Sequence, residues 1–146
     1  MKARLQITEL THDDIVNIIS YLFCESDFEV GYKKSDYNSI PADKRYKPSN
    51  GSSICFEDKI ADCLLNGKTI SITDLQAEEE VYGNLKHHIN AEDGSVIYYV
   101  TLQDFLNGLS CPDALNDVKA IMDETDDYWN SYNIIQYVIF GELIYG

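Results

Sequence analysis

Residues 95–108, SVIYYVTLQDFLNG, hold a strand signal that is followed directly by a helix signal. The first half is rich in Val, Ile and Tyr, the residue types that are enriched in strands. Thr101 is a good N-cap for a short helix over residues 102–107, and Gly108 can end that helix. The dipeptide Asp93-Gly94 before the strand favours a tight turn. The stretch therefore predicts a domain that mixes strands with helices.

The same two signals recur elsewhere in the chain. Alternation of apolar and polar residues predicts a strand, and apolar residues at helical spacing after a capping residue predict a helix. The predicted strands cover residues 3–8, 28–32 and 68–73, and the predicted helices cover residues 11–23 (capped by Thr11), 54–66 (capped by Ser53) and 112–122 (with Pro112 in the first turn). Residues 75–90 fit a helix or a strand equally well.

The last apolar segment also has two interpretations. Thr125 can cap a helix that ends at Gly141, with apolar residues at helical spacing: Tyr128, Tyr132, Ile135 and Ile139. Residues 134–144 are nevertheless rich in β-branched residues, which favour a strand. With either outcome we expect an α+β fold, a single compact domain over residues 1–146 with four or five helices packed on a small sheet of short strands.

Residues 33–53 are predicted to form a long loop, because they contain Pro41, Pro48 and the turn dipeptide Asn50-Gly51. A loop of this length is uncommon in a compact domain and is often functional or mobile. Basic residues alternate in it with tyrosines, a composition that can contact phosphates and stack on bases. The candidate anion contacts are Lys33, Lys34, Lys44, Arg45 and Lys47.

The negative charge is concentrated in the last two-thirds of the chain. The formal net charge is −14; residues 1–50 hold seven basic and eight acidic residues, whereas residues 51–146 hold four and seventeen. Such a field attracts a basic partner and disfavours direct binding to nucleic acid or to an anionic membrane. Excluding the acids expected in the first turns of helices, the candidate partner-binding residues are Asp74, Glu78, Glu79, Glu80, Glu92 and Asp93.

No catalytic, metal or cofactor motif is found in the sequence. The four cysteines include no Cys-x-x-Cys pair, so free thiols are expected. The adjacent histidines His87 and His88 point to different sides of any regular element and chelate one metal poorly. The acidic turns lack the glycine and glutamate of an EF-hand loop, and no glycine-rich phosphate loop occurs. We therefore expect no cofactor, no metal and no identifiable catalytic residue.

The location expected from the sequence is the cytoplasm. No apolar run approaches the roughly 20 residues that span a bilayer, and the N-terminal residues lack the apolar core of a signal peptide. Neither the oligomeric state nor the partner follows from the sequence.

These observations favour a non-enzymatic acidic protein that binds another macromolecule. One such role is to regulate or inhibit a basic, DNA-binding protein by presenting carboxylates in place of DNA phosphates. Two alternatives remain: a small enzyme with an unrecognised carboxylate or Cys/His site, and a homo-oligomeric structural protein. The interface of the latter would use the exposed part of an aromatic group: Tyr128, Trp129, Tyr132 and Tyr137.

Overall fold

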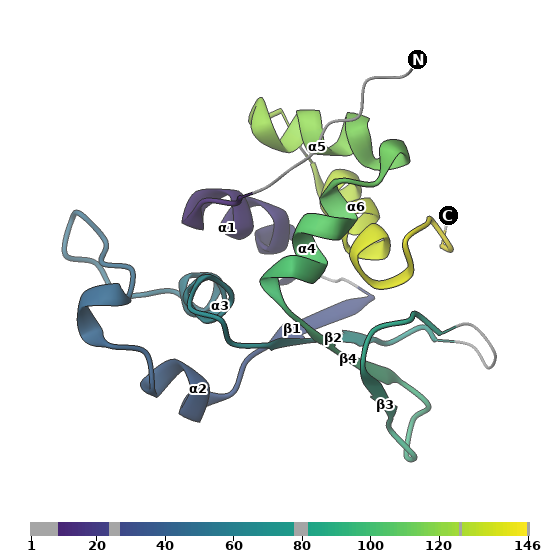
Figure 1. Ribbon diagram of the computed structural model, residues 1–146, viewed down its shortest axis with the longest axis horizontal. Coiled ribbons are helices and arrows are strands. Elements are labelled where there is room, and N and C mark those ends of the chain that lie inside the picture. Colours follow the sequence, from purple (N-terminus) through teal and green to yellow (C-terminus); the bar gives the residue numbers. More distant parts are fainter. Residues whose placement is uncertain (1–8, 24–26, 78–81, 126, 146) are drawn as a thin grey trace.

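The computed structural model describes residues 9–23, 27–77, 82–125 and 127–145. These residues form one α+β domain, in which six α-helices accompany a four-stranded antiparallel sheet (Figure 1). The predicted fold class is confirmed. The predicted strand over residues 3–8 lies outside the described residues.

The sheet has the strand order β1-β2-β4-β3. Its strands are β1 (Phe28–Gly31), β2 (Ile70–Asp74), β3 (His87–Ile89) and β4 (Val96–Val100). Side chains of β2 and β4 alternate between buried and half-buried, as expected when helices cover one face of a sheet. Strands were predicted at β1, β2 and β4, whereas β3 falls in the ambiguous segment.

The helices are short and lie mostly on one side of the sheet (Figure 1). They are α1 (His12–Ser20), α2 (Lys34–Asn38), α3 (Phe56–Leu65), α4 (Leu102–Leu109), α5 (Leu115–Met122) and α6 (Tyr128–Phe140). The caps predicted for α1 and α4 are present: the Thr11 hydroxyl accepts a hydrogen bond from the Asp14 amide at 3.1 Å, and Thr101 makes the equivalent contact. Among the described residues, no helix is long and apolar enough to cross a membrane.

Several predicted helix boundaries are wrong. Helix α3 begins at Phe56 instead of residue 54, because the Asp58 carboxylate accepts a hydrogen bond from the Cys55 amide and fixes the N-cap there. Helix α6 is capped by Asp127, whose carboxylate accepts from two amides of the first turn, instead of by Thr125. Helix α4 continues past Gly108 to Leu109.

The last apolar segment is a helix as far as Phe140, and Gly141 ends it with a left-handed φ of 74°. The chain then turns back along α6. Gln136, which is fully buried, holds this return: its side-chain oxygen accepts from the amides of Ile144 and Tyr145, and its side-chain nitrogen donates to the Tyr145 carbonyl. These bonds place the Tyr145 side chain against the sheet.

The predicted loop over residues 33–53 is partly structured. It contains α2 and a 3₁₀ turn over Ala42–Lys44. Arg45 folds this segment onto itself, donating hydrogen bonds to the carbonyls of Ile40 and Asn38, with its guanidinium 4.8 Å from the centre of the Tyr37 ring. The sequence did not predict these elements, because they depend on contacts made by single side chains and not on a periodic apolar pattern.

Candidate functional site

Asp74 is buried in the interior and cannot meet a partner at the surface. Its side chain is 0% exposed at the end of β2. The hydroxyl of Tyr145 donates to one carboxylate oxygen at 2.7 Å, and the amide of Gln76 donates to the other at 3.1 Å. Burial raises the pKa of Asp74 above its usual range, although both hydrogen bonds oppose the shift. The expectation that Asp74 belongs to an acidic surface is therefore wrong.

The other predicted acidic residues have different outcomes. Glu92 and Asp93 are exposed in the turn between β3 and β4. Hydrogen bonds from the side chain and amide of Ser95 lower the pKa of Asp93, so its charge is kept while it shapes the turn. The residues Glu78, Glu79 and Glu80 lie outside the part of the chain that the structure describes.

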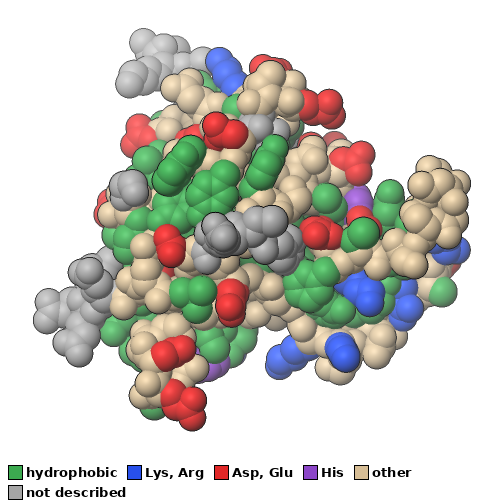
Figure 2. All heavy atoms as spheres, turned by 180° about the vertical axis from the view of Figure 1, so that it is seen from behind, with side chains coloured by type: hydrophobic (Ala, Val, Ile, Leu, Met, Phe, Trp, Pro, Cys, Tyr) green, Lys and Arg blue, Asp and Glu red, His purple; other side chains and the backbone are tan. Residues whose placement is uncertain are grey.

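The predicted basic residues are divided by the fold. Lys33 and Lys34 are exposed at the start of α2, and Lys44 and Lys47 are exposed further along the segment. Arg45 is turned inward, as described above, so its guanidinium is already used within the loop. Seen from behind, most Lys and Arg side chains gather on the side of α2 and α3 (Figure 2).

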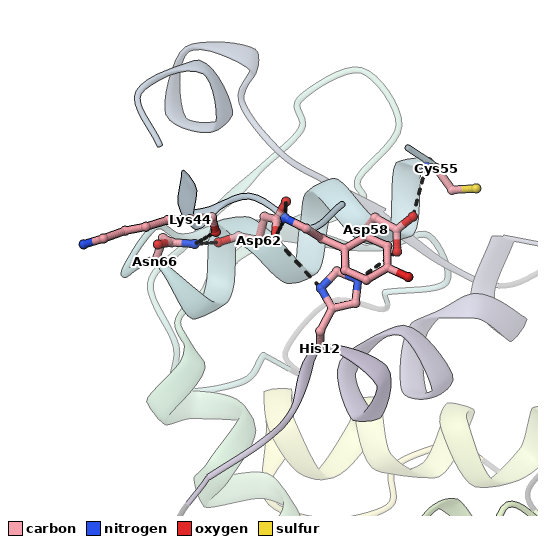
Figure 3. Close-up of polar contacts among 7 residues, drawn as sticks. His12, Lys44, Cys55, Asp58, Asp62 and Asn66 are labelled. Carbon is pink, nitrogen blue, oxygen red and sulfur yellow. Dashed lines mark hydrogen bonds and ion pairs between the residues drawn. The ribbon is translucent and has the colours of Figure 1, made fainter. Parts of the chain in front are cut away.

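A cluster of His12, Tyr46, Asp58 and Asp62 joins α1, α3 and the segment between α2 and α3. Figure 3 shows His12 lying between Asp58 and Asp62. The His12 Nε2 atom lies 2.8 Å from Asp58 Oδ1, and its Nδ1 atom lies 3.8 Å from Asp62 Oδ1. The ring of Tyr46 stacks on the imidazole at 4.0 Å, and its amide donates to both oxygens of Asp62 at 3.0 Å. We call these four residues the His12 cluster. No pattern in the sequence predicts this cluster, because its members are up to fifty residues apart.

The His12 cluster has the composition of a catalytic site but the geometry of a structural one. A general base needs a free nitrogen within hydrogen-bonding reach of a substrate. Both nitrogens of His12 face carboxylates, and one face of its ring is covered by Tyr46. Burial is the main cause that raises the pKa of Asp62, while the Tyr46 amide and His12 lower it. The arrangement fixes the segment that carries Tyr46 to α3.

Replacing His12 with alanine should weaken this attachment. The change removes the bond to Asp58 and the ring stack, and leaves the buried Asp62 carboxylate with fewer partners, so we expect a loss of about 1–3 kcal/mol in the free energy of unfolding. Limited proteolysis should then cut residues 41–53 faster. Asp13→Ala, an exposed change in the same helix turn, is the matched control. Equal cleavage of both variants would contradict the structural role.

The described cysteines do not form a nucleophilic site with a histidine. Cys55, Cys63 and Cys111 are free thiols. Burial raises the pKa of Cys63 to about 11, which suppresses the reactive thiolate. The sulfur of Cys55 points away from the ring of His12 (Figure 3). Within the described ranges, no three His, Cys, Asp or Glu side chains are placed to hold a metal ion.

The exposed aromatic residue of the last helix directly follows an acidic turn. Tyr132 and Tyr137 are buried, whereas Trp129 is 57% exposed and packs edge-on against Tyr128 and Tyr132. Three exposed acids precede it in the turn between α5 and α6: Asp123, Glu124 and Asp127. We call Trp129 and these acids the Trp129 surface. The aromatic group could be predicted from the sequence, but not which of its members is exposed.

Comparisons with known proteins give no relative from which a function could be transferred: no protein-family model, curated protein or solved structure matches this chain.

Proposed function

We propose that this protein is a non-enzymatic binding protein that recognises a basic macromolecule, such as a DNA-binding protein, through its acidic surface. The observation that carries the proposal is the separation of charge along the fold. Residues 101–146 hold eight acidic residues and one basic residue, Lys119. The described basic residues otherwise lie between Lys33 and Lys86, in the half of the chain that forms α2, α3 and the sheet.

The Trp129 surface is the best candidate for the centre of the contact. Trp is enriched among the residues that dominate binding energy at interfaces, and such residues are usually surrounded by a polar rim. Trp129 is anchored to the core through Tyr132, so little side-chain freedom remains to be lost on binding. The acids in the preceding turn would guide a cationic partner to it and would make association dependent on salt.

The enzymatic alternative has less support from the described residues. In His12, Nε2 is hydrogen-bonded to Asp58, Nδ1 faces Asp62 at 3.8 Å, and Tyr46 covers one face of the ring. Burial keeps Cys63 as a thiol. The homo-oligomeric alternative uses the same Trp129 surface. Measuring the mass of the purified protein in solution distinguishes a basic partner from a second copy of this chain. If the protein is a dimer and Trp129→Ala makes it monomeric, a second copy covers the Trp129 surface.

Affinity capture with the immobilised protein tests the proposal. We expect a basic protein to be retained at low salt, to elute as salt rises, and to be displaced by duplex DNA. Trp129→Ala and the pair Asp123→Asn/Glu124→Gln should each reduce retention at least about tenfold, a change typical of an interface hot spot.

The controls are an exposed apolar residue and an exposed acid elsewhere, Leu65→Ala and Asp43→Asn. Asp127 is left unchanged because it caps α6. Retention of the same partner in molar salt, or equal retention by the test and control variants, would contradict the proposal.

A further inference from the structure

Among the described residues, no helix lies across one face of the sheet. The helices lie mostly on one side of the sheet (Figure 1), and the alternate residues of β2 and β4 that are buried belong to that covered side. Strand pairing sets Gly31, Ser71 and Tyr99 in one row on the opposite side. Two shallow hollows on this side, of about 230 and 430 Å³, share Lys33, Thr69 and Tyr99, so they form a continuous trough.

The trough is positively charged although the protein is strongly acidic. Lys33 and Lys86 line it, and both are exposed. The hydroxyls of Thr69 and Ser71 add hydrogen-bonding groups. Among the residues that the structure describes, no Asp or Glu lines either hollow. Glu29 is the carboxylate on the paired strands that comes nearest to the trough. It lies two residues before Gly31 on β1, outside the row of Gly31, Ser71 and Tyr99. Because the lysines line the trough and Glu29 lies outside it, an anionic ligand is attracted to the end of the sheet beside Lys33 and Lys86.

Aromatic rings accompany the lysines. Tyr99 lines both hollows, and its hydroxyl lies 2.7 Å from His88 Nδ1, with the two rings stacked at a centroid distance of 5.6 Å. At the other end, Tyr32 lines the smaller hollow and packs 5.2 Å from the ring of Phe56, which is 43% exposed. An open sheet that presents aromatic rings between cations can stack bases while the cations contact phosphates.

We infer that this face binds single-stranded nucleic acid. In this arrangement Lys33 and Lys86 contact phosphates, the ring of Tyr99 stacks on a base, and Thr69 and His88 donate or accept hydrogen bonds at its edges. Unpaired bases are required, because the bases of a duplex are stacked on one another and cannot lie on Tyr99.

The inference departs from the expectation that the total charge disfavours nucleic acid. At physiological ionic strength charges are screened beyond about 8 Å, so the charge of the trough itself governs a ligand that lies in it. The trough is on the sheet, whereas the acids of the Trp129 surface follow α5 in the chain. The two binding proposals therefore concern different residues and can fail independently.

Fluorescence anisotropy with labelled oligonucleotides of about a dozen uridines or thymidines tests the inference at low salt. We expect binding of the single strands, RNA and DNA being compared directly, with at least tenfold weaker binding of the matching duplex. The variant Lys33→Gln/Lys86→Gln should reduce the slope of log affinity against log salt by about 1.4, since each phosphate contact on a single strand contributes about 0.7.

Substitutions of Tyr99 separate base stacking from charge. Tyr99→Leu should weaken binding by about five- to a hundredfold, whereas Tyr99→Phe, which keeps the ring, should bind within about twofold of the wild type. Lys119→Gln, an exposed lysine on α5, is the charge control and should leave binding unchanged. Circular dichroism and the unfolding midpoint confirm that each variant is folded.

Three results would overturn the inference. The first is no detectable binding of any single strand at low salt. The second is binding of inorganic polyphosphate as tight as that of the oligonucleotides together with no effect of Tyr99→Leu, which would make the trough a plain anion site. The third is an equal loss of binding in Lys119→Gln, which would place the contact elsewhere.

Discussion

Replacing Gly108 with alanine should destabilise the fold by about 2–3 kcal/mol, although alanine is the better helix former by about 1 kcal/mol. Gly108 is buried in the last turn of α4, where that helix crosses α6. A β-carbon at this position would lie 2.7 Å from both the Cα and the backbone nitrogen of Val138, and 2.7 Å from its Cγ2 atom. Backbone atoms cannot rotate away, so the two helices must move apart.

Thermal and urea unfolding measure this effect. For a domain of this size we expect the melting temperature to fall by roughly 4–10 °C. Asn107→Ala, an exposed change one residue earlier in the same helix, should be neutral within about 0.5 kcal/mol. Val138→Ala in the Gly108→Ala background should restore little stability, since two of the three close contacts are with backbone. A Gly108→Ala variant as stable as the wild type would refute this account of the helix crossing.

Gly108 shows where prediction from the sequence stops. Local signals in the sequence predicted the strand β4, the Thr101 cap and the helix that follows, because each depends on residues within one or two turns. The same logic treated Gly108 as a helix end, where glycine is common. Its actual place is set by the approach of Val138, thirty residues later in the chain, and no local pattern carries that information.

The candidate sites follow the same rule. The exposed positions of Lys33, Lys34, Glu92 and Asp93 agree with what a loop or turn implies. The burial of Asp74 does not: Asp74 follows Ile70 and Ile72 on the covered face of β2. The hydroxyl that serves its carboxylate there comes from Tyr145, on the return segment that Gln136 holds. The His12 cluster likewise needs the packing of α1 on α3. In each case the missing information is a contact between segments far apart in the sequence, which one sequence without its fold does not contain.

The charge pattern acquires a different meaning in three dimensions. Composition alone describes a strongly acidic protein in which the basic segment over residues 33–53 is a minor exception. In the fold, Arg45 and the His12 cluster hold the basic segment against α3, and Lys33 at its start lines the trough on the sheet. If both proposals hold, the protein has two chemically opposite surfaces, with the acids of the Trp129 surface meeting a basic partner and the lysines of the trough meeting an anionic ligand.

Truncating Asp74 to alanine should be the most destructive single change to the buried polar groups, with a loss of about 3 kcal/mol or more. It leaves the hydroxyl of Tyr145 and the amide of Gln76 without their acceptor and opens a void under the C-terminal segment. Asp74→Asn is the matched control. Its oxygen can still accept from the Gln76 amide, and its amide group can donate to the Tyr145 oxygen, so the loss should stay within about 1 kcal/mol.

The pH dependence of unfolding distinguishes the charge of Asp74 from its shape. Because burial raises the pKa of Asp74 above the value of about 3.9 for an unfolded chain, the folded protein holds this proton more tightly. The contribution of Asp74 to the free energy of unfolding is therefore greatest at pH values below its pKa in the unfolded chain. This contribution is lost as the pH rises through its pKa in the folded protein. Asp74→Asn has no ionisable group at this position, and the contribution of Asp62 is common to both proteins. Urea midpoints measured from about pH 4 to pH 7 should thus move steadily in favour of the asparagine variant. A constant difference across that range would mean that Asp74 ionises as freely in the fold as in the unfolded chain.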